Sequence, residues 1–146
     1  MRALRVVFAS HGGLGCAMRE AVAMILGVSV KEVTDCVELL EGESFENYYE
    51  KLASRVDGDT IVLADLFGGT PSKAALMLLQ ESKVKAVITG FNMAMVIQLL
   101  SSQDEDLESL VLGAKSAGME GVRAFVGPGL RELTGKKEEG PSGKDF

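Results

Sequence analysis

Apolar residues along this chain form short runs that alternate with segments of helical spacing. Runs typical of strands occupy residues 4–9, 32–40, 60–65, 84–90 and 121–126. Between them, apolar residues recur every three or four positions in five segments that predict helices, at residues 17–26, 45–56, 70–82, 92–102 and 105–118. This alternation predicts an α/β fold: a single three-layer domain whose mostly parallel central sheet carries helices on both faces.

The composition of the runs predicts where some strands lie in the sheet. Residues 60–65 and 84–90 are almost continuously apolar, which is typical of strands covered on both faces. Residues 32–40 mix polar and apolar side chains, so this strand is expected near a sheet edge. The segment 121–126 is expected to be the last strand.

Two helices carry recognisable start signals. Ser44 precedes a series with apolar residues at one-face spacing, namely Phe45, Tyr48, Tyr49, Leu52 and Val56, and is the expected N-cap of that helix. Thr70 is the expected N-cap of the helix at 70–82, with Pro71 at its first helical position.

The length of the chain and its polar C-terminal end suggest one folded domain followed by a tail. A chain of 146 residues is large enough for one domain with a real core, which we assign to residues 1–130. Residues 131–146 are too polar to pack and are expected to form a disordered tail.

Charge and hydropathy exclude several classes of protein. The net charge of −6 and the lack of a basic stripe argue against a nucleic-acid partner, and an acidic surface would suit a basic protein partner. No apolar run approaches the roughly 20 residues that span a bilayer, so no membrane insertion is expected. The first residues show no cleavage-like site, so a cytoplasmic location is expected.

The chain contains two cysteines, Cys16 and Cys36, twenty positions apart. They form no CxxC motif, and with a single histidine in the chain they indicate neither a zinc site nor a disulfide framework. We therefore expect two reduced, partly buried thiols, with Cys16 filling space in the first turn of a helix.

Two side chains that could take part in catalysis follow the ends of two predicted strands. His11, the only histidine, follows the first strand, and Asp65 follows the third. In parallel sheets, ligands meet the carboxyl ends of the strands where the strand order reverses, so adjacent strands would bring both side chains to one crevice. Asp65 would then accept a hydrogen bond from one ring N–H of His11 and leave the other nitrogen free to attack.

The stretch "FGGTP" could hold the electrophile. Gly68 and Gly69 allow a close backbone approach, Thr70 offers a hydroxyl, and a following helix aims its free amides outward, which suits a phosphoryl group. Each piece also has a plainer reading: His11 as an exposed turn residue, Asp65 as a turn former, and this stretch as a loop with an N-cap.

A nucleotide site is a rival interpretation of the glycines near His11. The spacing Gly13-x-Gly15 is followed by Met18 where a dinucleotide fingerprint needs its third glycine. No Gly-Lys-Ser/Thr follows, which excludes a P-loop. A flavodoxin-like binding domain remains an alternative, and it predicts a nucleotide-induced thermal shift.

Four stretches resemble the enzyme IIA components of the mannose-type sugar phosphotransferase system, over residues 4–126. They are "SHG" from Ser10, "EGES" from Glu41, "DLFGGTP" from Asp65 and "VITGFNMAM" from Val87. The pair "SHG" and "DLFGGTP" is the specific part of the resemblance.

The resemblance implies a function. His11 matches the family's phosphorylated histidine, which takes a phosphoryl group from the carrier HPr and passes it to an enzyme IIB component, here a separate polypeptide. Asp65 matches its paired carboxylate, and Gly69 and Thr70 match positions that contact the phosphoryl group. No metal or organic cofactor is implied. The family also implies a homodimer in which the last strand, 121–126, is antiparallel and exchanged.

Two departures from the family pattern lie near the site. An extra glycine in Gly13-Leu14-Gly15 predicts a looser start of the first helix, and Ala94 replaces a proline in a bordering loop. An alternative role is that of a non-transporting regulator controlled by phosphorylation of His11, since transport and regulation need the same site.

Overall fold

The computed structural model of this chain describes residues 4–104 and 106–135. Its core is a sheet of four parallel strands in the order β2-β1-β3-β4. The strands are β1 (Arg5–His11), β2 (Thr34–Leu39), β3 (Thr60–Ala64) and β4 (Ala86–Thr89). The predicted α/β fold with a mostly parallel central sheet is therefore confirmed.

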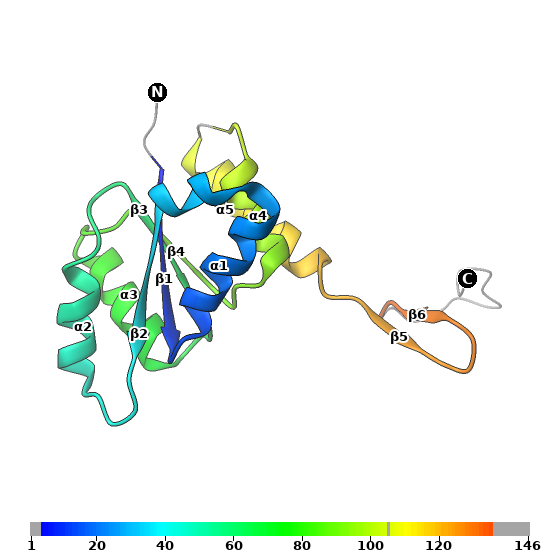
Figure 1. Ribbon diagram of the computed structural model, residues 1–146, viewed down its shortest axis with the longest axis horizontal. Helices are drawn as coiled ribbons and strands as arrows, with labels where there is room; N and C mark the ends of the chain where they lie inside the picture. The colour runs from blue at the N-terminus through cyan, green and yellow to red at the C-terminus, as the bar shows by residue number, and fades with distance from the viewer. Residues whose placement is uncertain (1–3, 105, 136–146) are drawn as a thin grey trace.

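Helices cover both faces of the sheet, which makes three layers (Figure 1). They are α1 (Leu14–Leu26), α2 (Phe45–Ala53), α3 (Thr70–Gln80), α4 (Met93–Ser101) and α5 (Leu107–Glu120), with a short 3₁₀ helix η1 (Val28–Glu32) after α1. α2 and α3 pack on one face, and α1, α4 and α5 pack on the other.

Alternating strand residues build the two halves of the core. In β1, Val6 and Phe8 point into the cluster under α1, α4 and α5, while Val7 and Ala9 point into the cluster under α2 and α3. Successive side chains of a strand face opposite sides, so a strand in the middle of the sheet needs apolar residues at every position. This explains why β1 is so continuously apolar.

Burial of the other strands follows their place in the sheet. Every residue of β3 is buried, as predicted, because β3 lies between β1 and β4. β2 lies at an edge, also as predicted. The prediction for 84–90 is wrong: β4 is the opposite edge strand, and its residues alternate between buried and half-buried.

The helix start signals were partly correct. The Ser44 side chain caps α2 by accepting a hydrogen bond from the backbone N–H of Asn47 at 3.0 Å. α3 begins at Thr70, so its N-cap is Gly69 and not Thr70 as predicted, and Pro71 lies in the first turn. The glycine cap leaves the Thr70 side chain available for other contacts.

The C-terminal strands form a separate hairpin that projects from the domain beyond α5 (Figure 1). β5 (Ala124–Val126) pairs antiparallel with β6 (Arg131–Leu133) of the same chain, so the prediction that 121–126 is the last strand is wrong, and its exchange with a second copy stays a prediction. The tail expected from residue 131 thus begins with a strand. Residues 136–146 of that predicted tail lie outside the described residues.

The two cysteines form a disulfide bond, so the prediction of reduced thiols, with Cys16 as a space filler, is wrong. Cys16 lies in the first turn of α1, and Cys36 lies opposite Phe8 in the register of β2 and β1. The bond therefore ties α1 to the edge strand that it covers. A spacing of twenty residues gave no sign that helix packing would bring the two side chains together.

Removing this disulfide is expected to destabilise the domain. The bond closes a loop of twenty positions, and restricting the unfolded chain in this way contributes about 3 kcal/mol. Urea unfolding of the oxidised protein and of the Cys16→Ser/Cys36→Ser variant would measure the difference. Two free thiols in the purified, non-reduced protein would contradict the bond itself.

Candidate functional site

His11 and Asp65 lie together at the carboxyl end of the sheet, as the sequence predicted. β1 and β3 are neighbours, with Ala9 opposite Ala64, so both strands end at the same edge. One oxygen of Asp65, Oδ2, lies 2.9 Å from Nδ1 of the His11 ring and also accepts the backbone N–H of His11 at 2.9 Å. The carboxylate thus holds both the ring and the backbone of one residue.

The two partners differ in exposure. The Asp65 side chain is 7% exposed, whereas the His11 side chain is 49% exposed. A buried carboxylate is stable when a proton donor faces it, which favours the tautomer with the proton on Nδ1. The other ring nitrogen, Nε2, then carries a lone pair directed away from Asp65, so His11 can act as a nucleophile toward a group outside the domain.

Tyr48 adds a buried phenol near this site. It is fully buried, and its hydroxyl donates to the carbonyl oxygen of Val37 at 2.8 Å. Burial raises the pKa of Tyr48, and the negative charge of Asp65 raises it further. The phenol therefore stays protonated at physiological pH and adds no second charge beside the carboxylate.

The glycine turn after β3 gives the His11 ring its space. A Cβ atom on Gly69 would lie 2.8 Å from Cε1 of His11, closer than real Cβ contacts come, and 3.3 Å from Nε2, which is tighter than most of them. Gly68 has φ +93°, a conformation that L side chains rarely adopt. Only glycine at both positions allows the turn to pass this close to the imidazole.

The amides of this turn already have acceptors. Gly68 N–H donates to the Ser72 hydroxyl at 2.9 Å, and Gly69 N–H donates to the Leu66 carbonyl at 3.3 Å. Donation from these two amides to a phosphoryl group would require those bonds to exchange. Thr70, half-buried at the start of α3, is the third member of the predicted site.

The first departure from the family pattern allows close packing between α1 and β1. Gly15 is buried in α1, and a Cβ atom there would lie 2.8 Å from Cβ of Phe8. The glycine thus lets α1 approach β1 closely, and the looser helix start stays a prediction. Ala94 lies in the first turn of α4, where a Cβ atom on Gly121 would come within 2.7 Å of it.

Large apolar side chains are exposed in the three segments that adjoin His11. We define this apolar rim as Leu14, Leu40, Leu66 and Phe67, of which Phe67 is 73% exposed. Leu14 opens α1, Leu40 follows β2, and the other two directly follow Asp65. Sequence reasoning missed the rim, although apolar residues inside glycine-rich loops beside His11 and Asp65 were a usable signal.

A protein-family comparison decides what kind of domain carries this site. The family model EIIA-man, described as "PTS system fructose IIA component", matches residues 5–112. The chain belongs to this family. The phosphotransferase-system resemblance of the motifs around His11 and Asp65 is therefore confirmed, and in this EIIA-man domain both residues lie inside the matched region.

Individual relatives agree with the family match. The mannose-specific EIIAB component of Escherichia coli K12 is 29% identical over 129 residues, which are 84% of this chain and 39% of that protein. The chain thus spans about two fifths of the length of that relative. The fructose-specific EIIA component of Bacillus subtilis is 26% identical over 106 residues, 69% of this chain and 71% of that protein.

Solved structures show the same fold. The mannose/sorbose-specific IIA subunit of the phosphotransferase system from Enterococcus faecalis superimposes with a TM-score of 0.78 at 26% identity, covering 88% of this chain and 98% of that one. An EIIA component from Streptococcus agalactiae gives a TM-score of 0.73 at 25% identity, covering 82% of this chain and 95% of that one.

Within the described part of this EIIA-man chain, no helix has the length and apolar character to cross a membrane.

Proposed function

We propose that this chain is a phosphoryl carrier of a sugar phosphotransferase system, with His11 as the residue that holds the phosphoryl group. It accepts the group from phosphohistidine on HPr and passes it to an enzyme IIB component. The observation that carries the proposal is the 2.9 Å contact between Nδ1 of His11 and Asp65, which directs the lone pair of Nε2 away from Asp65 in a half-exposed ring.

The chemistry follows from this geometry. The Nε2 lone pair attacks phosphorus, a new N–P bond forms, and the N–P bond of the donor breaks with its electron pair returning to the donor nitrogen. The His11 ring becomes positively charged, and Asp65 balances that charge while it keeps the proton on Nδ1. The Thr70 hydroxyl at the start of α3 is the donor that we assign to the phosphoryl oxygens.

The partner is expected to dock on the apolar rim. Transfer between two protein side chains needs both reacting atoms within a few ångströms, so a donor must cover the surface around Nε2. That surface includes Leu14, Leu40, Leu66 and Phe67. The acidic surface that we expect to attract a basic partner then lies outside this rim. The cytoplasmic location of the protein stays a prediction.

Phosphorylation in a reconstituted system tests the proposal. The purified chain is incubated with phosphoenolpyruvate, enzyme I and HPr, and the labelled product is treated with acid and with base. We expect one phosphate per chain that is acid-labile and base-stable, located at His11 by peptide mapping. Onward transfer to an enzyme IIB component separates a transport role from a regulatory one, and no labelling in the presence of active HPr would refute the proposal.

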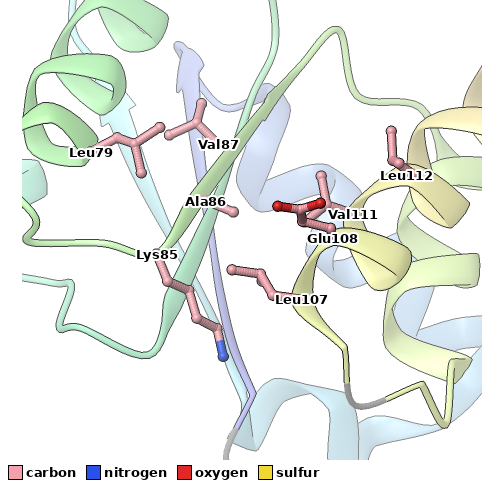
Figure 2. A pocket seen from close by; sticks show the side chains of 8 residues that line it. All are labelled: Leu79, Lys85, Ala86, Val87, Leu107, Glu108, Val111 and Leu112. Atoms are coloured by element: carbon pink, nitrogen blue, oxygen red, sulfur yellow. The ribbon is translucent and has the colours of Figure 1, made fainter.

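We also propose that the family's homodimer forms here through the β5–β6 hairpin. A hollow of about 440 Å³ follows the edge strand β4, where Ala86, Leu107 and Val111 line it on the α5 side and Val87 and Leu79 line it on the α3 side (Figure 2). β4 is a sheet edge, and Phe125 and other apolar side chains of the hairpin are exposed. A hairpin from a second copy would extend the sheet and cover both apolar surfaces.

A charge on the hairpin is expected to prevent this association. Phe125→Asp would place a carboxylate against the apolar wall of the hollow, so we expect a shift from dimer to monomer in sedimentation equilibrium. Met24→Asp is the matched control, because Met24 is 87% exposed and does not line the hollow. A monomeric parent protein, or a variant that dimerises as the parent does, would contradict this assembly.

A further inference from the structure

Ser10, the residue before His11, holds the turn that follows β1. Its side chain is almost fully buried, at 1% exposure. Its hydroxyl accepts a hydrogen bond from the backbone N–H of Gly15 at 2.8 Å and donates to the carbonyl oxygen of Gly12 at 3.0 Å. One hydroxyl therefore links the end of β1, the turn after His11 and the first turn of α1.

Ser72 makes the same pair of bonds on the other turn of the site. It is fully buried in the first turn of α3. Its hydroxyl accepts the backbone N–H of Gly68 at 2.9 Å and donates to the carbonyl oxygen of Gly69 at 3.0 Å. These are the two glycines of the turn that passes beside the His11 ring.

The two serines control the backbone on both sides of the imidazole. Ser10 bonds to the turn that follows His11, and Ser72 bonds to both glycines of the turn beside the ring. Gly69 leaves no room for a Cβ atom beside Cε1, so a small displacement of this turn changes the space around Nε2. Glycine turns are permissive in conformation, and without an added constraint they would sample other positions.

We propose that Ser10 and Ser72 are positioning residues for phosphoryl transfer at His11, an inference that rests on the proposed function. Neither hydroxyl needs to touch the phosphoryl group. Each holds a glycine turn so that Nε2, the Thr70 side chain and the incoming phosphorus meet in a reactive arrangement. Sequence reasoning missed both residues because a serine before a histidine, or inside the first turn of a helix, is ordinary.

Alanine variants of the two serines test this role. Ser10→Ala and Ser72→Ala each remove one hydroxyl and leave a glycine amide without its acceptor. We expect the transfer rate at saturating phospho-HPr to fall about tenfold to a hundredfold, with little change in the apparent KM, since the docking surface is intact. The final stoichiometry of one phosphate per chain should be unchanged.

A matched control and a rescue separate positioning from stability. Thr60→Val removes another fully buried hydroxyl, which bonds with Asp57 at the opposite end of β3, and it should leave the rate unchanged. Ser10→Thr keeps the hydroxyl on a strand residue and should restore the rate. His11 is the only histidine, so its Hε1 resonance reports the ring alone and should shift in Ser72→Ala but not in Thr60→Val.

The outcomes distinguish the two proposals. If the parent protein takes up no phosphate, the proposed function fails, and the positioning role fails with it. If the parent is phosphorylated and both alanine variants transfer as fast as Thr60→Val, with an unmoved His11 resonance, the positioning role is wrong and the carrier function stands.

Discussion

Replacing His11 by alanine is expected to abolish phosphoryl uptake from phospho-HPr, with a loss of at least about 10³-fold in rate. Nε2 of His11 is the atom that we propose forms the N–P bond, and no second imidazole in the chain can take its place. The measurement is incorporation of labelled phosphate over time, with base-stable label counted after removal of HPr.

The fold of the His11→Ala variant should persist. The ring is half-exposed, and the backbone N–H of residue 11 still donates to Asp65, so the buried carboxylate keeps one partner. His11→Gln is a second variant that retains a polar side chain without a nucleophilic ring nitrogen, and the same loss is expected. Label uptake at the parent rate by either variant would place the phosphoryl group on another residue.

Asp65→Asn is expected to slow transfer by about 10²-fold or more while the domain stays folded. The amide is similar in size but neutral, so it cannot balance the positive charge on a phosphorylated ring. Its NH₂ group can also donate to Nδ1, which moves the ring proton to Nε2 and blocks the attacking lone pair. Single-turnover kinetics with phospho-HPr would measure the change.

Asp35→Asn is the matched control for this variant. Asp35 accepts hydrogen bonds from Arg5 and Arg55 near the start of β1, so it also carries a paired carboxylate, but away from the catalytic edge. We expect its transfer rate to stay within about twofold of the parent, because Asp35 lies away from the catalytic edge. The domain should stay folded, because surface ion pairs contribute little to the free energy of folding. Equal rates for Asp65→Asn and the parent would remove Asp65 from the mechanism.

Local patterns were enough to predict much of this fold. The one-face spacing that begins at Phe45 and the Ser44 cap both describe α2 as observed. The continuous apolar run at 60–64 identified a strand in the middle of the sheet, although the similar run at 84–90 belongs to an edge strand. Apolar content alone does not separate these cases, because an edge strand can be covered by helices or by another copy of the chain.

The contact between His11 and Asp65 was predictable for a topological reason. Parallel strands joined by helices end at the same edge, so residues that follow two strands meet there once those strands are neighbours. The sequence identified His11 and Asp65 as residues that follow strands, and the connection rule for parallel strands predicted that they meet at the carboxyl edge of the sheet. Close contacts of the ring, such as the one with Gly69, are decided only by the tertiary structure.

By itself, the sequence determined the order of the four sheet strands and the five α-helices, the family, and the pair of residues at the carboxyl edge, because each depends on local patterns or on a general rule of connection. Only the tertiary structure decided that Cys16 bonds to Cys36, that Gly15 lets α1 approach β1, and that Ser10 and Ser72 hold the glycine turns. The disulfide and the Gly15 contact depend on the depth at which α1 packs on the sheet, whereas the serine bonds join residues within five positions and depend on the turn conformations that the packed fold selects. The depth of α1 is set by many close-packed side chains together, so no local sequence pattern determines it.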